Sequence, residues 1–348
     1  LESGMKLPEP FASVRALFEP KPTEWLVVEF NGFNVRAMRS IVKDGDLEIS
    51  NVVQSNRPTI DACFSDVIDA FQRHSEALPP QAILITSQAA CSILELPINP
   101  FGPCNEAELS ELVRWEFEQQ ITEQLAILTI DTIMVGRGLI TEAEVDKARE
   151  AMLTQNPGTR SVATAPAKFA DQAVAMGLID RAPADECLKL LESFQTLDDN
   201  LSCKFFPTSR EGDSPGDAGF PWLVSGLGET ARSQWVARFE SLGVRLERIY
   251  PIGYTSSAAL DPVNEDSPHA ILDLLDGLDC YAAYDGNQLT ALRWGPAPLS
   301  PRNPEALINL IGSDRLDHLW VSGRSEIAKP VATAIHEGLN VPVKAFPP

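Results

Sequence analysis

Apolar runs that end in polar turns occur three times along the chain, at residues 25–39, 269–289 and 319–339. In the first two, a second strand-like run follows the turn, and in the third a helix-like run follows it. Helical periodicity marks further segments at residues 59–76, 105–121, 230–242 and 304–311. Asn105 is predicted to begin the second of these helices, with Glu108 as its capping-box partner. This alternation predicts an α/β protein in two halves, each of which begins with a strand, a turn and a second strand.

Residues 137–196 have a different character, because they are rich in alanine and helical in pattern. The sequence GLIT at residues 138–141 recurs as GLID at residues 177–180, and each copy precedes a helix-like segment. The copies are 177 − 138 = 39 residues apart, a spacing that suits a repeated pair of helices. Thr141 and Asp180 are good N-cap residues for the helices that follow.

These boundaries predict three parts. Residues 5–136 form a first lobe, and residues 137–212 form a helical insertion with a linker rich in Gly, Pro, Ser and Asp. Residues 213–348 complete the first lobe and form the second. Residues 125–135 alternate in part and are predicted to be a strand of the first lobe.

The net charge of −21 makes nucleic acids and anionic lipid surfaces poor partners, whereas basic protein segments remain possible. The acidity is equally compatible with a role in solubility alone. The six cysteines form no CxxC pair, so we predict buried thiols in a reducing cytosol and no metal site. No apolar run has the length of a membrane helix, and no signal peptide is visible.

The ends of the sequence suggest a fragment. Residues 1–4 precede a methionine and look like a cloning scar, and the chain stops directly after a strand-like segment. A continuation into a membrane helix is therefore left open. The four histidines are dispersed, and the sequence contains no HExxH, GxSxG or P-loop pattern.

Three passages carry a resemblance to a known family. They are WLVVEFNGFNVRAM from residue 25, ILELP with NEAELSELVRWEFEQQI from residue 93, and DHLWVSGRSEIAKPVATAIHEGLNVPVKAF from residue 317. Together they resemble the PilM, MshI and GspL group of the actin-like ATPase superfamily, cytoplasmic proteins of type IV pilus and type II secretion machines. The resemblance implies a duplicated actin-like, ribonuclease H-like fold in two lobes, with a helical insertion.

The resemblance also implies a nucleotide cleft between the lobes, and here the residues depart from the family pattern. By position Glu29, Asn31 and Arg36 belong to the first phosphate turn, where Asn31 replaces a glycine. Leu275 replaces a glycine of the second turn. The residues that remain at the second and third turns are Asp273, Gly277, Ser322 and Gly323. Phosphate turns need small residues that leave backbone N–H groups accessible, so we expect a degenerate cleft.

Glu29 and Asp273 also fit a purely structural role, in which they bond to backbone N–H groups at strand ends. Arg324 in the third turn suits either a phosphate or solvent. The insertion resembles the N-terminal domain of GspE and MshE ATPases, some of which bind a cyclic dinucleotide through an Arg-Leu-Gly motif. The corresponding residues here are Lys168, Phe169 and Ala170, which favours a protein-interaction module over a nucleotide sensor.

In the family, a groove on the first lobe binds an extended tail of a membrane-anchored partner. By analogy the helix at residues 105–121 and the strands at residues 125–135 and 221–226 would line it. The apolar residues Leu109, Val113, Trp115 and Phe117 cannot all face one core, so they are candidates for partner binding.

We therefore expect a non-enzymatic adaptor without cofactor or metal. It would link a membrane-anchored subunit to the cytoplasmic machinery or its ATPase, and would lie in the cytoplasm at the bacterial inner membrane. The alternative is an ATP–Mg²⁺-binding protein whose nucleotide state switches partner binding.

Overall fold

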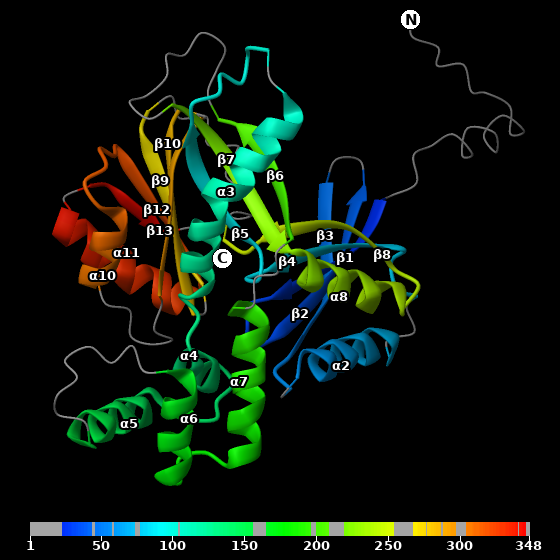
Figure 1. Cartoon of the computed structure of the whole chain (residues 1–348), viewed down its shortest axis with the longest axis vertical. Helices are drawn as coiled ribbons and strands as arrows, with labels where there is room; N and C mark the ends of the chain where they lie inside the picture. Colours follow the sequence, from blue (N-terminus) through cyan, green and yellow to red (C-terminus); the bar gives the residue numbers. More distant parts are fainter. Residues whose placement is uncertain are drawn as a thin grey trace, which may run out of the picture.

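The structure is a computed structural model of the chain (Figure 1). The residues that it describes are 23–43, 46–57, 59–73, 77–103, 105–155, 165–195, 200–208, 219–253, 267–275, 277–286, 288–296, 304–339 and 341–345. Cys104, most of the predicted linker and the segment before residue 23 lie outside these ranges.

The first lobe is built on a five-stranded sheet, sheet A, in the order β3-β2-β1-β4-β8. Its strands are β1 (Thr23–Phe30), β2 (Val35–Lys43), β3 (Asp46–Ser55), β4 (Gln81–Thr86) and β8 (Arg245–Pro251). Helices α2 (Ile60–Arg73) and α8 (Glu229–Glu240) pack together on one face of this sheet, where the ring of Phe64 meets Phe239 at 5.3 Å.

A second, three-stranded sheet, sheet B, is formed by strands that lie between β4 and α8 in the sequence, and has the order β5-β7-β6. It consists of β5 (Ala90–Leu96), β7 (Phe220–Gly228) and β6 (Leu201–Pro207). Strand β6 was not predicted from the sequence. Helix α3 (Glu106–Leu125) packs on this sheet, and its cap is as predicted: Asn105 Oδ1 accepts a hydrogen bond from the N–H of Ala107 at 3.1 Å, and Asn105 Nδ2 donates to Glu108.

The second lobe repeats the topology of sheet A. Sheet C has the order β11-β10-β9-β12-β13, with antiparallel pairing from β9 to β10 to β11 and parallel pairing from β9 to β12 to β13. Its elements are β9 (His269–Leu274), β10 (Leu278–Asp285), β11 (Gln288–Pro296), β12 (His318–Ser322), β13 (Val343–Ala345), α10 (Pro304–Ile311) and α11 (Ser325–Leu339). Sheet A pairs in the same way, so the predicted duplication is confirmed.

Four helices follow α3 and lie below the two lobes in Figure 1: α4 (Ile130–Gly136), α5 (Glu142–Gln155), α6 (Pro166–Ala175) and α7 (Arg181–Gln195). The predicted repeat is visible in their turns. Gly138 and Gly177 have φ of 70° and 68°. In each copy the next leucine N–H bonds to a carbonyl five residues earlier, which is a Schellman C-cap.

The prediction of a strand at residues 125–135 is wrong. The segment contains the end of α3 and most of α4, in which Ile130, Ile133 and Met134 are buried at helical spacing. A short apolar run does not distinguish a strand from a buried helix by periodicity, and Thr129 begins the helix as its N-cap residue.

The described cysteines agree with the prediction of buried thiols. Cys63, Cys91, Cys187 and Cys280 are buried, Cys203 is half-buried, and none of them forms a disulfide. Burial raises the pKa of Cys187 and Cys203 to about 11.

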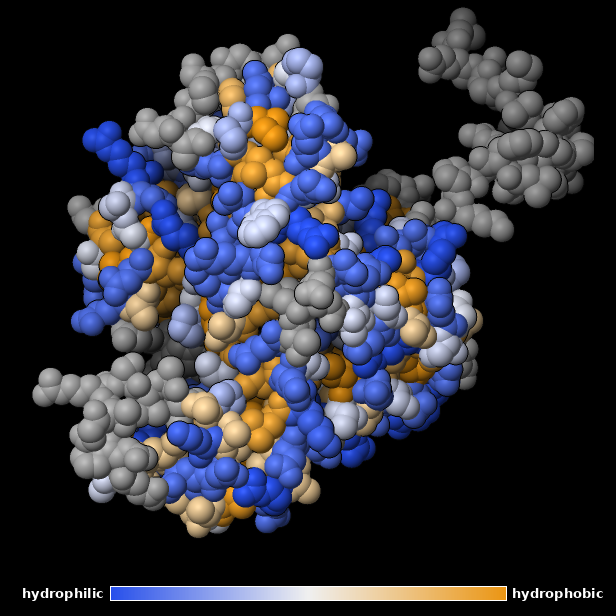
Figure 2. All heavy atoms as spheres, in the orientation of Figure 1, coloured by the Kyte–Doolittle hydropathy of each residue, from blue (hydrophilic) through white to orange (hydrophobic). Residues whose placement is uncertain are grey.

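Among the described residues, no helix has the length and apolarity for crossing a membrane, and no acidic, His or Cys side chains cluster as metal ligands do. The face drawn in Figure 2 is largely hydrophilic.

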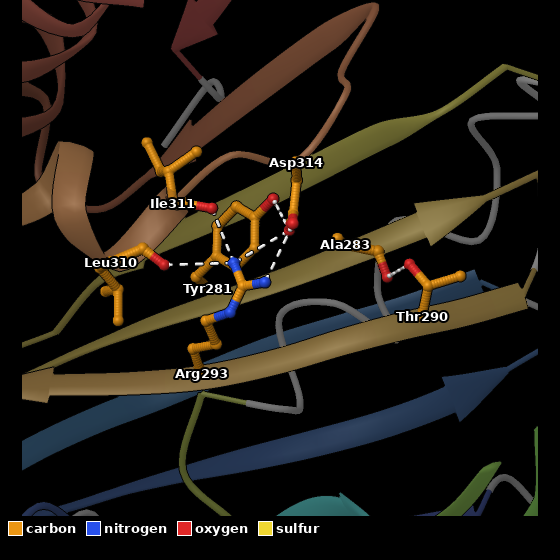
Figure 3. A network of polar contacts seen from close by, with 7 residues as sticks. All are labelled: Tyr281, Ala283, Thr290, Arg293, Leu310, Ile311 and Asp314. Atoms are coloured by element: carbon orange, nitrogen blue, oxygen red, sulfur yellow. Dashed lines mark hydrogen bonds and ion pairs between the residues drawn. The ribbon is translucent and has the colours of Figure 1, made fainter. Parts of the chain in front are cut away.

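The second lobe contains a polar network between its sheet and α10 (Figure 3). Arg293 on β11 forms two hydrogen bonds with Asp314 and donates to the carbonyl oxygens of Leu310 and Ile311 at the end of α10. Tyr281 donates to the same carboxylate at 2.9 Å. Partial burial favours the protonated carboxyl, but the bonds from Arg293 and Tyr281 outweigh it and lower the pKa of Asp314.

We expect Arg293→Ala to destabilise the protein by about 2 kcal/mol at pH 7, because Asp314 and the helix carbonyls lose a charged donor. Since the pKa of Asp314 is lowered by folding, its contribution is complete above the ordinary value of 3.8 and is lost as pH falls below it. Urea unfolding at pH 7 and pH 3 measures both effects. Arg181→Ala, which breaks exposed ion pairs with Asp171 and Asp185, is the matched control and should leave stability nearly unchanged.

Candidate functional site

The first predicted phosphate turn, residues 31–34, is closed by its own side chains. The Oδ1 of Asn31 accepts hydrogen bonds from the N–H groups of Phe33 at 3.3 Å and Asn34 at 3.0 Å. Asn31 is buried, so its side chain uses N–H groups that a phosphate would need. Glu29 faces Arg36 across β1 and β2, and the two side chains form an ion pair at 3.5 Å.

The glycine of this turn, Gly32, packs against side chains from other parts of the chain. Gly32 has φ of 103°, and a Cβ at this position would lie 3.0 Å from Leu128 and 3.4 Å from Phe194 of α7. The ring of Phe194 also packs on Phe30, with centroids 5.4 Å apart. The space above the first turn is therefore occupied by the end of the α3–α4 connection and by α7.

Phe33 fills the region between the first and second turns. It is 2% exposed. A Cβ at Gly277 in the second turn would lie 3.1 Å from Phe33 and 3.2 Å from Thr132 of α4. A Cβ at Gly136 of α4 would lie 2.8 Å from the ring. The aromatic ring thus lies against both glycines, at the place where the first lobe, the second lobe and α4 meet.

The third turn packs on the second. A Cβ at Gly323, whose φ is 142°, would lie 3.0 Å from Leu274 Cβ and 3.1 Å from its carbonyl oxygen. Strand pairing places Asp273, which is 2% exposed, opposite Ser322. Arg324 is exposed. The structure thus joins Glu29 to Arg36 by an ion pair and places Asp273 opposite Ser322 on neighbouring strands. Protein atoms lie against each of the turn glycines.

The sequence reasoning missed the residues that fill this region: Phe33, Leu128, Thr132, Gly136 and Phe194. Phe33 was detectable from the sequence, because a phosphate-binding turn needs small residues and an aromatic residue inside it departs from that pattern. The others were not, because they come from helices whose position relative to the lobes is set by tertiary packing.

The predicted partner-binding residues on α3 require a correction. Leu109, Val113 and Phe117 are 5%, 0% and 0% exposed and form one stripe against sheet B, so they are core residues and not partner contacts. Trp115 lies on the opposite side of the helix and is 79% exposed. The expected groove strand at residues 125–135 does not exist.

A groove lies instead between sheets A and B. It has a volume of about 220 Å³ and is lined by β6, β7, α8 and β8. Strand β8 is an edge of sheet A, and β6 is an edge of sheet B. Lys204, Arg232 and Arg248 line the groove beside a single carboxylate, Glu247, so its charge differs in sign from that of the whole chain.

The insertion shows no basic motif at the positions expected for a cyclic dinucleotide. Phe169 and Ala170 are buried in the core of α4–α7, and Lys168 is exposed. A cavity of about 680 Å³ lies beside Phe169, and the ion pair between Asp131 and Arg149, 2.5 Å apart, is at its wall.

No family model and no curated protein matches the sequence. Among solved structures, the PilM–PilN type IV pilus biogenesis complex matches with a TM-score of 0.53 at 10% identity, over 92% of this chain and 87% of that chain. A Bacteroides thetaiotaomicron protein with an actin-like ATPase fold and unknown function matches with a TM-score of 0.45 at 6% identity, over 93% and 91%. The cytoplasmic domain of EpsL, an inner membrane component of the Vibrio cholerae type II secretion system, gives 0.36 at 8%, over 86% and 81%.

The similarity to the PilM–PilN structure confirms the predicted fold, the two-lobed actin-like α/β fold of the PilM type. At 10% identity it is a finding about fold alone. The likeness of the insertion to a secretion-ATPase domain stays a prediction.

We expect Gly136→Ala to destabilise the protein by about 1–3 kcal/mol, because the added methyl group overlaps the ring of Phe33. The matched control comes from the repeat: Ala175 stands 39 residues later, at the equivalent helix position, and is exposed. Ala175→Gly should cost about 0.5–1 kcal/mol through backbone entropy. Equal effects of the two substitutions in urea unfolding would contradict the packing role of Phe33.

Proposed function

We propose that this chain is a non-enzymatic adaptor of a type IV pilus or type II secretion assembly. It holds the cytoplasmic tail of a membrane-anchored subunit and presents it to the machinery. The observation that supports this most directly is the packing of protein atoms against all three turn glycines, Gly32, Gly277 and Gly323. A triphosphate needs those backbone surfaces, so a fold of this type without them retains its scaffold but loses its ligand.

The groove between β6 and β8 is the surface that we assign to the partner. Two edge strands present backbone N–H and C=O groups on either side of it, and an extended segment pairs with such edges through main-chain hydrogen bonds. A solved structure with the same fold is a complex of PilM with PilN. By that analogy the occupant here is a tail of an inner-membrane assembly subunit.

The absence of nucleotide binding is tested by thermal unfolding. Adding ATP–Mg²⁺ to about 1 mM should leave the Tm unchanged within about 1 °C, because a ligand stabilises the folded state only when its concentration approaches its Kd. A rise in Tm that grows with ATP concentration would support the alternative, a nucleotide-dependent switch.

Partner binding is tested with labelled peptides that cover the cytoplasmic tails of the host's inner-membrane assembly subunits. Ser225→Trp places a large ring in the groove and should weaken binding at least about tenfold, a loss of about 1.4 kcal/mol. Gln234→Trp, on the exposed side of α8, is the control and should bind as the unmodified chain does. Equal affinity of the two variants would place the partner elsewhere on the surface.

A further inference from the structure

Sheet A is apolar on both faces, but α2 and α8 cover one of them. Leu26, Val28 and Leu84 alternate toward the helices and are 0% exposed. Trp25, Val27 and Ile83 alternate to the opposite side, where they are half-buried and belong to none of the three core clusters of the described residues. A sheet with two apolar faces requires cover on both.

The second face continues into the β2–β3 hairpin, where its apolar residues are exposed. Val42, Leu47 and Ile49 are 41%, 61% and 55% exposed. Val42 is opposite Leu47, and Ser40 is opposite both Trp25 and Ile49, so these residues share one side of the sheet. We call the surface formed by Trp25, Val27, Val42, Leu47 and Ile49 the open face.

We propose that the open face is the docking surface for residues 5–22 of this same chain. The first reason is position. Residue 23 begins β1, and its backbone pairs with Val42, whose other neighbour is Leu47. Two strand spacings amount to about 10 Å. The five residues from Phe18 to residue 23 can extend about 17 Å, so the segment reaches the open face directly from its point of attachment.

The second reason is the apolar pattern of the segment. Phe11, Val14, Leu17 and Phe18 recur at intervals of three and four residues, a spacing that places side chains on one side of a helix. Pro20 and Pro22 stand immediately before β1. Because proline lacks the N–H that a strand ladder uses, these two positions are poorly suited to a continuation of β1.

The third reason is charge. Residues 5–22 contain three basic side chains (Lys6, Arg15 and Lys21) and two acidic ones (Glu9 and Glu19), which gives 3 − 2 = +1 in a chain whose net charge is −21. A second copy of the chain would bring another strongly acidic molecule to the hairpin, whereas this segment lacks that excess of negative charge. The covalent tether also gives the segment an effective concentration of about 1 mM, so a weak contact suffices to cover the face.

Hydrogen exchange on the full chain tests the proposal. Amides of residues 11–18 should exchange at least about tenfold more slowly than those of the isolated 5–22 peptide. In the double variant Leu47→Glu with Ile49→Glu this protection should disappear. Ser50→Glu is the matched control, because Ser50 is exposed on the same strand but opposite Arg39, toward the α2 side, and protection should remain.

A second measurement uses the labelled 5–22 peptide in trans with a chain that begins at residue 23. The peptide should bind this shortened chain at least about tenfold more tightly than the full chain, in which its site is already occupied. Absence of protection in residues 11–18, or equal loss of protection in the Ser50→Glu control, overturns the proposal. The proposal is also overturned if the shortened chain does not bind the peptide and instead dimerises through Ile49, because the occupant of the open face would then be a second copy.

Discussion

The contact between Phe33 and the two glycines Gly136 and Gly277 is the interaction on which the arrangement of the molecule depends. Gly277 belongs to the turn that opens the second lobe, and Gly136 ends α4. A single aromatic ring from the first lobe therefore joins three parts of the chain that are far apart in sequence. Neither glycine can carry a side chain without displacing the ring, so packing requires a small residue at both positions.

The helices of the insertion also pack against the first lobe at its first turn. The α3–α4 connection covers Gly32 through Leu128, and α7 covers it through Phe194. Burial of these side chains continues the core of the first lobe into the helices. Hydrophobic burial thus holds the side chains that cover the first turn in place.

The lobes are also joined on the other side of sheet B. The indole N–H of Trp294 on β11 donates to the carbonyl oxygen of Cys91 on β5 at 3.0 Å, and its ring packs on Gly253. Phe33, which is buried, and Trp294, which is half-buried, thus provide two aromatic contacts between the lobes. A movement that separates the lobes would have to break both contacts.

The sequence by itself determined the elements whose periodicity is long or whose caps are explicit. It predicted the duplicated strand–turn–strand halves, the cap of α3 at Asn105 and the repeat around Gly138 and Gly177, because local patterns and left-handed glycines dictate these features. It also marked the phosphate turns as altered at Asn31. These are properties of short segments and need no knowledge of distant residues.

Tertiary structure alone decided what fills the cleft and which apolar residues are exposed. The run at residues 125–135 became helix because its side chains pack at helical spacing against partners that come later in the chain. Leu109, Val113 and Phe117 became core, while Trp115 stayed outside, because helix phase relative to sheet B selects the buried stripe. Phe33 lies against Gly136 and Gly277, which are 103 and 244 positions away, and no local pattern encodes contacts at such separation.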